Sequence, residues 1–198
     1  MTLANKITLG RMVSVPFVWW SLYEGHYLLA FCLFFVAALS DGVDGYVARK
    51  FGQQTALGAI LDPLADKLLL TMTFIILTAS PHTLVPLPAW LTVAVTYRDL
   101  LIMLGAGMVK WLCPTMQFRP IVSSKLTTFF QIATVLVVCL ANLLSEFHYN
   151  PAWLSKPIHA ISVITGLLCL VSVLGYYRAG VWMLATESEE PARVEAEA

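Results

Sequence analysis

The chain has 198 residues, of which 59% are apolar and only 12% are charged, and its formal net charge is zero. A soluble domain is typically about 25% charged, so this chain has too few charged side chains to cover a water-facing surface. The mean hydropathy of +0.77 points to the bilayer as its solvent. The balanced charge, without a basic stripe, argues against a nucleic-acid partner.

Apolar stretches long enough to cross a bilayer follow one another along the chain. About 20 helical residues cross the hydrocarbon core, and turn-forming or charged residues separate the stretches. The first stretch contains Pro16 and is followed by no small-residue cleavage site, so we interpret it as a retained span rather than a signal peptide. Six stretches meet the measure: 7–23, 27–49, 57–79, 86–111, 122–145 and 157–183.

The sequence therefore predicts an all-α polytopic membrane protein with six transmembrane helices. Residues 1–185 would form one transmembrane domain, and the acidic, apolar-poor residues 186–198 a disordered tail. Lysine and arginine gather in the loops of one side, which the positive-inside rule assigns to the cytoplasm together with both chain ends. These basic residues are Lys6, Arg49, Lys50, Lys110, Arg119, Lys125 and Arg193, with Arg178 close by, whereas the opposite loops carry only Lys156.

Acidic residues lie within the second and third stretches, where a charge is costly and usually faces a protein interior. Asp41 and Asp44 are three residues apart, and Asp62 and Asp66 are four apart, so each pair lies on one face of a helix. Asp41 would lie about 13 Å from Lys50 along its helix, and Asp66 roughly 15 Å from Ala56 along the next one. If the two helices are antiparallel neighbours, these residues lie at a similar depth. The four carboxylates are therefore expected to share one pocket that opens to the cytoplasmic side.

Four carboxylates in one pocket of low dielectric constant need compensating positive charge. Arg49 and Lys67 would supply part of it. The remaining ligands are oxygens only, with no histidine or cysteine nearby, which favours a pair of hard divalent cations such as Mg²⁺ or Mn²⁺. Two such ions suit a reaction at phosphorus. The alternatives are polar contacts between helices and an ion or proton path through the aspartates; the absence of an internal repeat argues against a carrier.

The same residues resemble the signature of the CDP-alcohol phosphatidyltransferases. The pattern is Asp41-x-x-Asp44-Gly45-x-x-Ala48-Arg49, eight residues, and Gly58-x-x-x-Asp62-x-x-x-Asp66, complete at every position. The N-terminal pattern Asn5-x-x-Thr8-x-x-Arg11, with Pro16 five residues on, is also similar to the opening of family members that make phosphatidylglycerophosphate or cardiolipin.

The resemblance implies a role for each motif residue and a catalytic function for residues 1–185. Asp41, Asp44, Asp62 and Asp66 would bind the metal pair, and Asp66 would also be the general base. The CDP moiety of CDP-diacylglycerol would be bound by a second, overlapping set: Asp41, Asp44, Gly45, Ala48, Arg49 and Gly58. The family further implies a homodimer in a bacterial inner membrane, with the active site facing the cytoplasm and CMP released as the product.

Three further cations are candidates for binding an anionic acceptor: Arg98, Arg119 and Lys125. Arg98 could instead pair with Asp99, and Lys125 could merely anchor the end of a helix. The pattern Ser124-Lys125-x-x-Thr128-x-x-Gln131 resembles members that use glycerol 3-phosphate and members that use phosphatidylglycerol, while Arg98-Asp99 is closer to the second group. We expect glycerol 3-phosphate as the acceptor, with phosphatidylglycerol as the alternative.

Overall fold

The computed structural model describes the backbone of residues 3–51, 58–112, 122–147 and 152–197, and the side chains of 9–40, 64–105, 107–108, 123–147 and 153–180. Within these ranges the chain is helical with short turns and contains no strand, which confirms the predicted all-α class. The helices are α1 (Leu3–Tyr23), α2 (Tyr27–Phe51), α3 (Gly58–Ala79), α4 (Ala89–Leu112), α5 (Val122–Glu146) and α6 (Ala152–Glu197).

The helix ends follow from local turn chemistry. Gly25 lies in the left-handed region with φ of 81°, which a residue with a side chain rarely adopts, so it ends α1 and lets α2 begin two residues later. The carbonyl of Pro88 accepts a hydrogen bond from the Leu91 amide at 3.0 Å. Because proline cannot donate within a helix, α4 begins at Ala89, three residues later than the sequence predicted.

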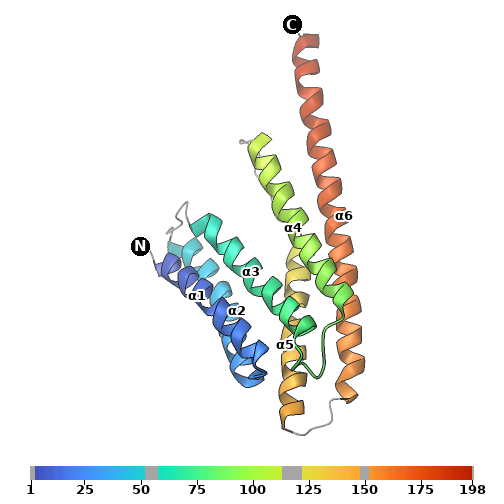
Figure 1. Cartoon of the computed structure of the whole chain (residues 1–198). Helices are drawn as coiled ribbons and strands as arrows, with labels where there is room; N and C mark the ends of the chain where they lie inside the picture. The colour runs from blue at the N-terminus through green and yellow to red at the C-terminus, as the bar shows by residue number, and fades with distance from the viewer. Residues whose placement is uncertain (1–2, 52–57, 113–121, 148–151, 198) are drawn as a thin grey trace.

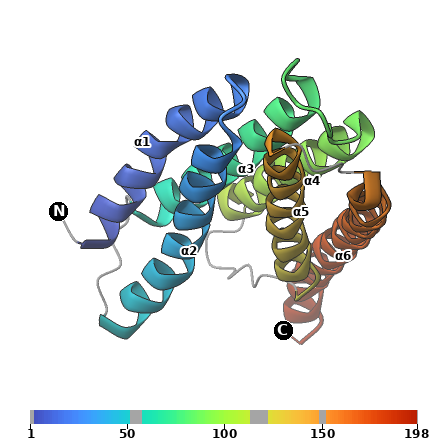
Figure 2. The same cartoon turned by 90° about the horizontal axis from the view of Figure 1, so that it is seen from below.

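The helices form two groups that share an interface (Figure 1). Helix α1 packs against α2 and α3, while α6 packs against α4 and α5. Helix α5 also contacts α2 and α3, and α3 contacts α4, so the two groups meet along α2, α3, α4 and α5 (Figure 2). Phe34, Phe74, Leu91 and Val135 are at most 1% exposed and bring α2, α3, α4 and α5 into one apolar core.

Hydroxyl groups link the helices within this core. Thr78 on α3 and Thr92 on α4 lie 2.6 Å apart, and Thr134 on α5 lies 3.0 Å from Thr165 on α6. The Thr127 hydroxyl also donates to the carbonyl of Leu168 at 3.1 Å. Such small polar contacts are typical of helix interfaces in membranes, where the hydrophobic effect does not draw helices together.

The outer surface is strongly apolar. Large side chains on α1 and α6 are more than half exposed, among them Phe17, Leu167, Leu170 and Leu174. A soluble monomer rarely exposes such a continuous apolar surface, but lipid tails can cover it. In the described part of the chain, two helical segments are long and apolar enough to cross a membrane, Ser123–Glu146 and Trp153–Gly180, and Tyr27–Ser40 is a shorter apolar helix. That all six helices are spans remains a prediction.

Helix α6 differs from the sequence prediction at both ends. It begins at Ala152 rather than at 157, and it continues to Glu197 through the stretch predicted to be a disordered tail. Alanine and glutamate are good helix formers, and Figure 1 shows this end of α6 projecting beyond the other helices. A short helical segment without packed neighbours is only marginally stable in water, so disorder of residues 186–198 in solution remains a prediction.

Candidate active site

The acidic motif lies on two helices, as the sequence predicted. Asp41 and Asp44 belong to α2, and Asp62 and Asp66 belong to α3. On this helical backbone, spacings of three and four residues are those that place a pair on one helix face. The side chains of Asp41, Asp44 and Asp62 lie outside the described residues, and the described side chains alone contain no cluster of metal-binding groups. The convergence of the four carboxylates therefore remains a prediction.

The predicted CDP-binding residues fall in the same region. Gly45, Ala48 and Arg49 lie in the last turns of α2, and Gly58 is the first residue of α3. Their side chains are likewise outside the described part of the chain. Helices α2 and α3 both pack against α1 and α5, which places the two halves of the motif on helices that share neighbours.

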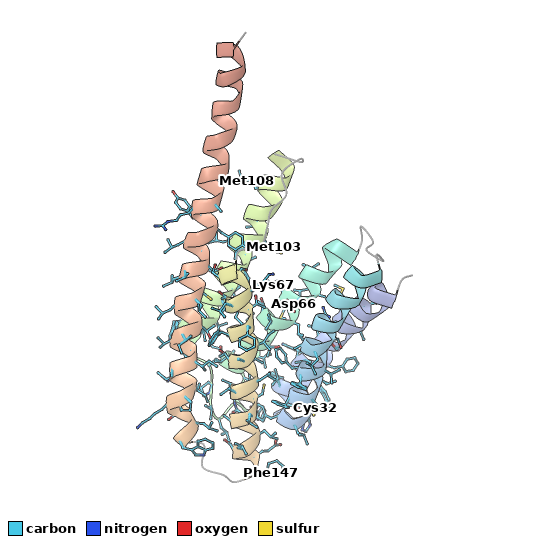
Figure 3. All side chains as sticks on the ribbon, turned by 180° about the vertical axis from the view of Figure 1, so that it is seen from behind. Cys32, Asp66, Lys67, Met103, Met108 and Phe147 are labelled. Carbon is cyan, nitrogen blue, oxygen red and sulfur yellow. The ribbon has the colours of Figure 1, made fainter. Side chains whose placement is uncertain are left out.

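Asp66 is the residue of the acidic motif whose side chain the structure describes, and Lys67 follows it on α3. Both side chains are partly buried on α3 (Figure 3). The Lys67 ammonium lies 3.0 Å from Oδ1 of Asp99 on α4, and the Lys67 side chain is 26% exposed. Since Lys67 follows Asp66 directly, this ion pair connects the acidic motif to α4.

Arg98 is fully buried and forms a junction between three helices. Its exposed fraction is only 2%, and its Nη1 donates to Oδ1 of Asp99 at 2.5 Å. Its Nε and Nη2 donate to the Ser172 hydroxyl of α6 at 3.2 and 3.0 Å. The Nη2 group also donates to the Ser124 hydroxyl of α5 at 2.6 Å. A buried guanidinium needs such acceptors to offset its loss of hydration.

These contacts bear on the predicted acceptor residues. The pairing of Arg98 with Asp99, which the sequence offered as an alternative, is present, and protein acceptors occupy each nitrogen of the guanidinium. Lys125 is exposed near the start of α5. Arg119 lies outside the described residues. The structure thus connects Arg98 directly to α5 and α6, and through Asp99 to Lys67 of α3.

We call five of these residues the polar junction: Lys67, Arg98, Asp99, Ser124 and Ser172. The sequence indicated Lys67 only as part of the charge balance, and Ser172 carried no signal at all, because it lies 74 residues from its partner Arg98. Gln131 of α5 is also fully buried, and its side-chain amide lies next to the thiol of Cys169 on α6. Its position on α5 was part of the sequence pattern, but its burial could not be read from that pattern.

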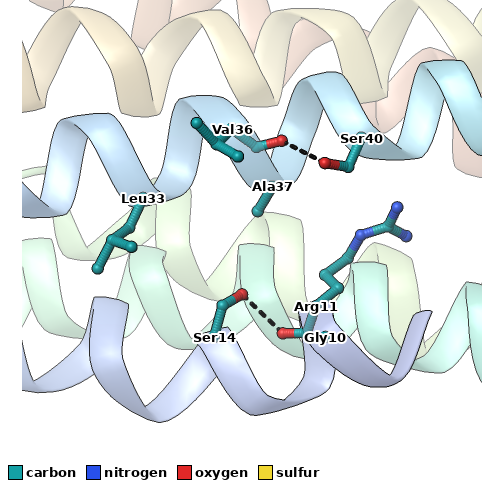
Figure 4. A pocket seen from close by; sticks show the side chains of 7 residues that line it. All are labelled: Gly10, Arg11, Ser14, Leu33, Val36, Ala37 and Ser40. Atoms are coloured by element: carbon teal, nitrogen blue, oxygen red, sulfur yellow. Dashed lines mark hydrogen bonds between the residues drawn. The ribbon is translucent and has the colours of Figure 1, made fainter. Parts of the chain in front are cut away.

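A cavity of about 210 Å³ lies between α1 and α2, beside the start of the acidic motif. Arg11 and Ser14 of α1 and Leu33, Val36 and Ser40 of α2 are among the residues that line it (Figure 4). Arg11 is only 4% exposed, and its side chain extends towards the end of α2 that carries Ser40. Ser40 immediately precedes Asp41, so this cation lies close to the predicted metal site.

Buried charges on adjoining helices of an apolar bundle define a helical membrane protein with a polar site within the bundle. Comparison with known proteins makes the class specific: residues 1–183 match the CDP-alcohol phosphatidyltransferase family. The chain belongs to this family of membrane enzymes, which confirms the resemblance seen in its motifs.

Individual relatives carry two different activities in their names. The chain is 30% identical to a CDP-diacylglycerol--glycerol-3-phosphate 3-phosphatidyltransferase of Aquifex aeolicus, over 94% of this chain and 100% of the relative. A protein of the same name from Pseudomonas fluorescens is 31% identical over 96% of this chain and 95% of the relative. A probable cardiolipin synthase (CMP-forming) of Drosophila melanogaster is 30% identical over 89% of this chain but only 56% of its own length.

Proposed function

We propose that this chain is a phosphatidylglycerophosphate synthase of phospholipid biosynthesis, which transfers the phosphatidyl group of CDP-diacylglycerol to glycerol 3-phosphate and releases CMP. The observation that carries the proposal is the family match over residues 1–183, together with a signature that is complete from Asp41 to Asp66. The names of two bacterial relatives that align over nearly their whole length support glycerol 3-phosphate as the acceptor.

The chemistry of the donor set fits a pair of divalent cations. Asp41, Asp44, Asp62 and Asp66 would offer only carboxylate oxygens, the ligands that Mg²⁺ and Mn²⁺ prefer. Their spacing on helical backbone gives each helix two carboxylates on one face. When bound, the cations would neutralise negative charge on the phosphate oxygens and on the departing CMP.

The protein groups would carry the rest of the reaction. Asp66 accepts the proton of the acceptor hydroxyl, and the resulting oxygen forms a bond to the lipid-proximal phosphorus. The bond from that phosphorus to the bridging oxygen breaks, and its electron pair leaves with CMP. Positioning and electrostatic stabilisation supply most of the acceleration in reactions of this kind. Buried Arg11, next to the start of the motif, adds positive charge where the diphosphate would lie.

Phosphatidylglycerol is the alternative acceptor, which would make the enzyme a cardiolipin synthase. The Drosophila relative carries that name, and Arg98-Asp99 resembles that branch. Both acceptors contain a glycerol hydroxyl and a phosphate, so the same site chemistry serves either. An ion or proton carrier is disfavoured because the chain belongs to an enzyme family.

An acceptor panel tests the proposal. The purified chain would be incubated with CDP-diacylglycerol, Mg²⁺ or Mn²⁺, and glycerol 3-phosphate, phosphatidylglycerol or inositol phosphate in separate reactions. We expect CMP and a product with the mass of phosphatidylglycerophosphate. Cardiolipin as the only product would favour the alternative, and no CMP with any acceptor would contradict the proposed function.

We further propose that all six helices cross a bacterial inner membrane, with both ends and the active site at the cytoplasmic face, and that the chain forms a homodimer. The basic residues at one side of the predicted spans support the orientation. The apolar outer surface leaves ample area for both lipid and a second copy. Crosslinking in native membranes would test the dimer, which predicts a product of twice the chain mass.

A further inference from the structure

The polar junction carries more positive than negative charge. It contains two cations, Lys67 and Arg98, and one anion, Asp99, whose Oδ1 atom accepts from both. Asp99 is only 6% exposed and Arg98 only 2%. In an interior of low dielectric constant, an excess charge is costly unless an anion compensates it. Lys67 also adjoins the acidic motif, but the proposed divalent cations would neutralise that motif, so the junction can still attract an anionic group.

Lys67 is the part of the junction that an anion could reach. Protein acceptors surround the Arg98 guanidinium, whereas the Lys67 side chain is 26% exposed. Its ammonium has three N–H bonds, and the described part of the chain supplies one acceptor for them, Asp99. The remaining N–H bonds can donate to oxygens from outside the junction.

The position of Lys67 indicates which oxygens these are. Lys67 adjoins the predicted base Asp66 (Figure 3), and its ammonium is directed to α4, whereas most of the predicted CDP-binding residues lie on α2. A group held between Asp66 and α4 would present its hydroxyl to the base and its phosphate to the ammonium. That is the arrangement which an acceptor with both groups requires.

We propose that Lys67 binds a phosphate oxygen of the acceptor and that Asp99 is a positioning residue that holds the Lys67 ammonium in place. Arg98, fixed by Ser124 and Ser172, in turn holds Asp99. The inference rests on the proposed function. The phosphate belongs either to a free phosphomonoester, as in glycerol 3-phosphate, or to a lipid phosphodiester, as in phosphatidylglycerol; the chemistry at Lys67 is the same.

The test compares Lys67→Met, Lys67→Arg and Asp99→Asn in the purified full chain, with exposed Lys156→Met at the far end of the molecule as the matched control. CMP release would be measured while either the acceptor or CDP-diacylglycerol is varied, in one arm with glycerol 3-phosphate and in another with phosphatidylglycerol. Because a hydrogen bond to a charged group is lost, Lys67→Met should raise the KM of the acceptor about tenfold or more. In the same variant, the KM of CDP-diacylglycerol should stay within about twofold of its original value. Lys67→Arg should retain most of the affinity for the acceptor. The control Lys156→Met should change neither KM.

Asp99→Asn separates positioning from net charge. Loss of the carboxylate makes the junction more positive, so a purely electrostatic effect would lower the KM of the acceptor. Positioning predicts a rise instead, because the ammonium is no longer held at α4. The arm in which the shift appears identifies the source of the phosphate.

Three results would overturn the inference: an unchanged acceptor KM in Lys67→Met, an equal rise in the KM of CDP-diacylglycerol, or a lower acceptor KM in Asp99→Asn. If Lys67→Met does not fold, Asp99→Asn alone decides by the direction of its shift. Failure of the proposed function looks different, because the unaltered chain would then release no CMP with any acceptor.

Discussion

Arg98 shows how this bundle accommodates a buried cation. The guanidinium is satisfied by one carboxylate and two hydroxyls, contributed by α4, α5 and α6. Each hydrogen bond to a charged group contributes about 1.5–3 kcal/mol, which offsets the cost of removing the cation from water. The sequence placed Arg98 within a helix and offered Asp99 as a partner, but its two serine partners lie 26 and 74 residues away, and periodicity says nothing about contacts at such separations.

The predictability of the site differs from residue to residue. The pattern from Asp41 to Asp66 could be chosen as the candidate site because its spacing is local and its charge is costly in a membrane. Ser172 could not, because a serine in an apolar helix carries no signal until its partner is known. Arg11 belongs to the N-terminal sequence pattern, but its burial beside a cavity depends on how α1 packs against α2 and could not be predicted.

Asp66 is the residue that we assign as the base, so Asp66→Asn should abolish measurable CMP release. The amide cannot accept the proton, and loss of a general base slows reactions by roughly 10²–10⁴-fold. The measurement is CMP release from CDP-diacylglycerol and glycerol 3-phosphate. Exposed Glu24→Gln, at the α1–α2 turn, is the matched control and should keep full activity. Full activity of Asp66→Asn in a folded protein would end the assignment.

At the scale of the elements, helix ends were predicted to within a few residues where glycine, proline or charge interrupts an apolar run, as at Gly25 and Pro88. The start of α6 was predicted at residue 157 because the prediction followed the apolar run alone. The structure begins this helix at Ala152. How the helices pair depends on contacts between distant residues and could not be predicted from the sequence.

Asn142 of α5 forms hydrogen bonds with the backbone of the segment between α3 and α4. Its side chain is fully buried, accepts from the Val85 amide at 3.0 Å and donates to the Val85 carbonyl at 3.1 Å. Asn142→Leu would leave both backbone groups without these partners, at a cost of roughly 1–3 kcal/mol each. We expect a clear fall in Tm in detergent. Ser145→Ala on the same helix removes a bond only to its own helix and should leave Tm nearly unchanged; equal Tm values for the two variants would contradict this role.

Gly166 of α6 lies against Trp90 of α4. A Cβ atom there would lie 2.6 Å from a ring atom of Trp90, whereas at Gly180 it would meet nothing within 4 Å. Alanine is a better helix former by about 1 kcal/mol, so Gly180→Ala should raise Tm slightly. Gly166→Ala should raise Tm less than Gly180→Ala does, or should lower it. In a Trp90→Ala background, the two substitutions should change Tm equally. Additive effects of Gly166→Ala and Trp90→Ala would contradict the contact.

At the scale of the whole molecule, the proposed topology predicts which turns reach each side of the membrane. In a chain without its native cysteines, His26→Cys should react with a membrane-impermeant maleimide added outside intact cells. Lys50→Cys should react only after permeabilisation, because the positive-inside rule places it in the cytoplasm. Labelling of Lys50→Cys in intact cells would reverse the orientation.

The central claim is that carboxylates of α2 and α3 jointly hold a pair of divalent cations. The most direct test is to measure the binding of Mn²⁺ to the purified chain in the presence of CDP-diacylglycerol. The electron paramagnetic resonance signal reports the Mn²⁺ that stays free. We predict two ions per chain, and a loss of binding in both Asp41→Asn and Asp62→Asn, because each helix contributes ligands. Unchanged Mn²⁺ binding in either variant would contradict a site shared by the two helices.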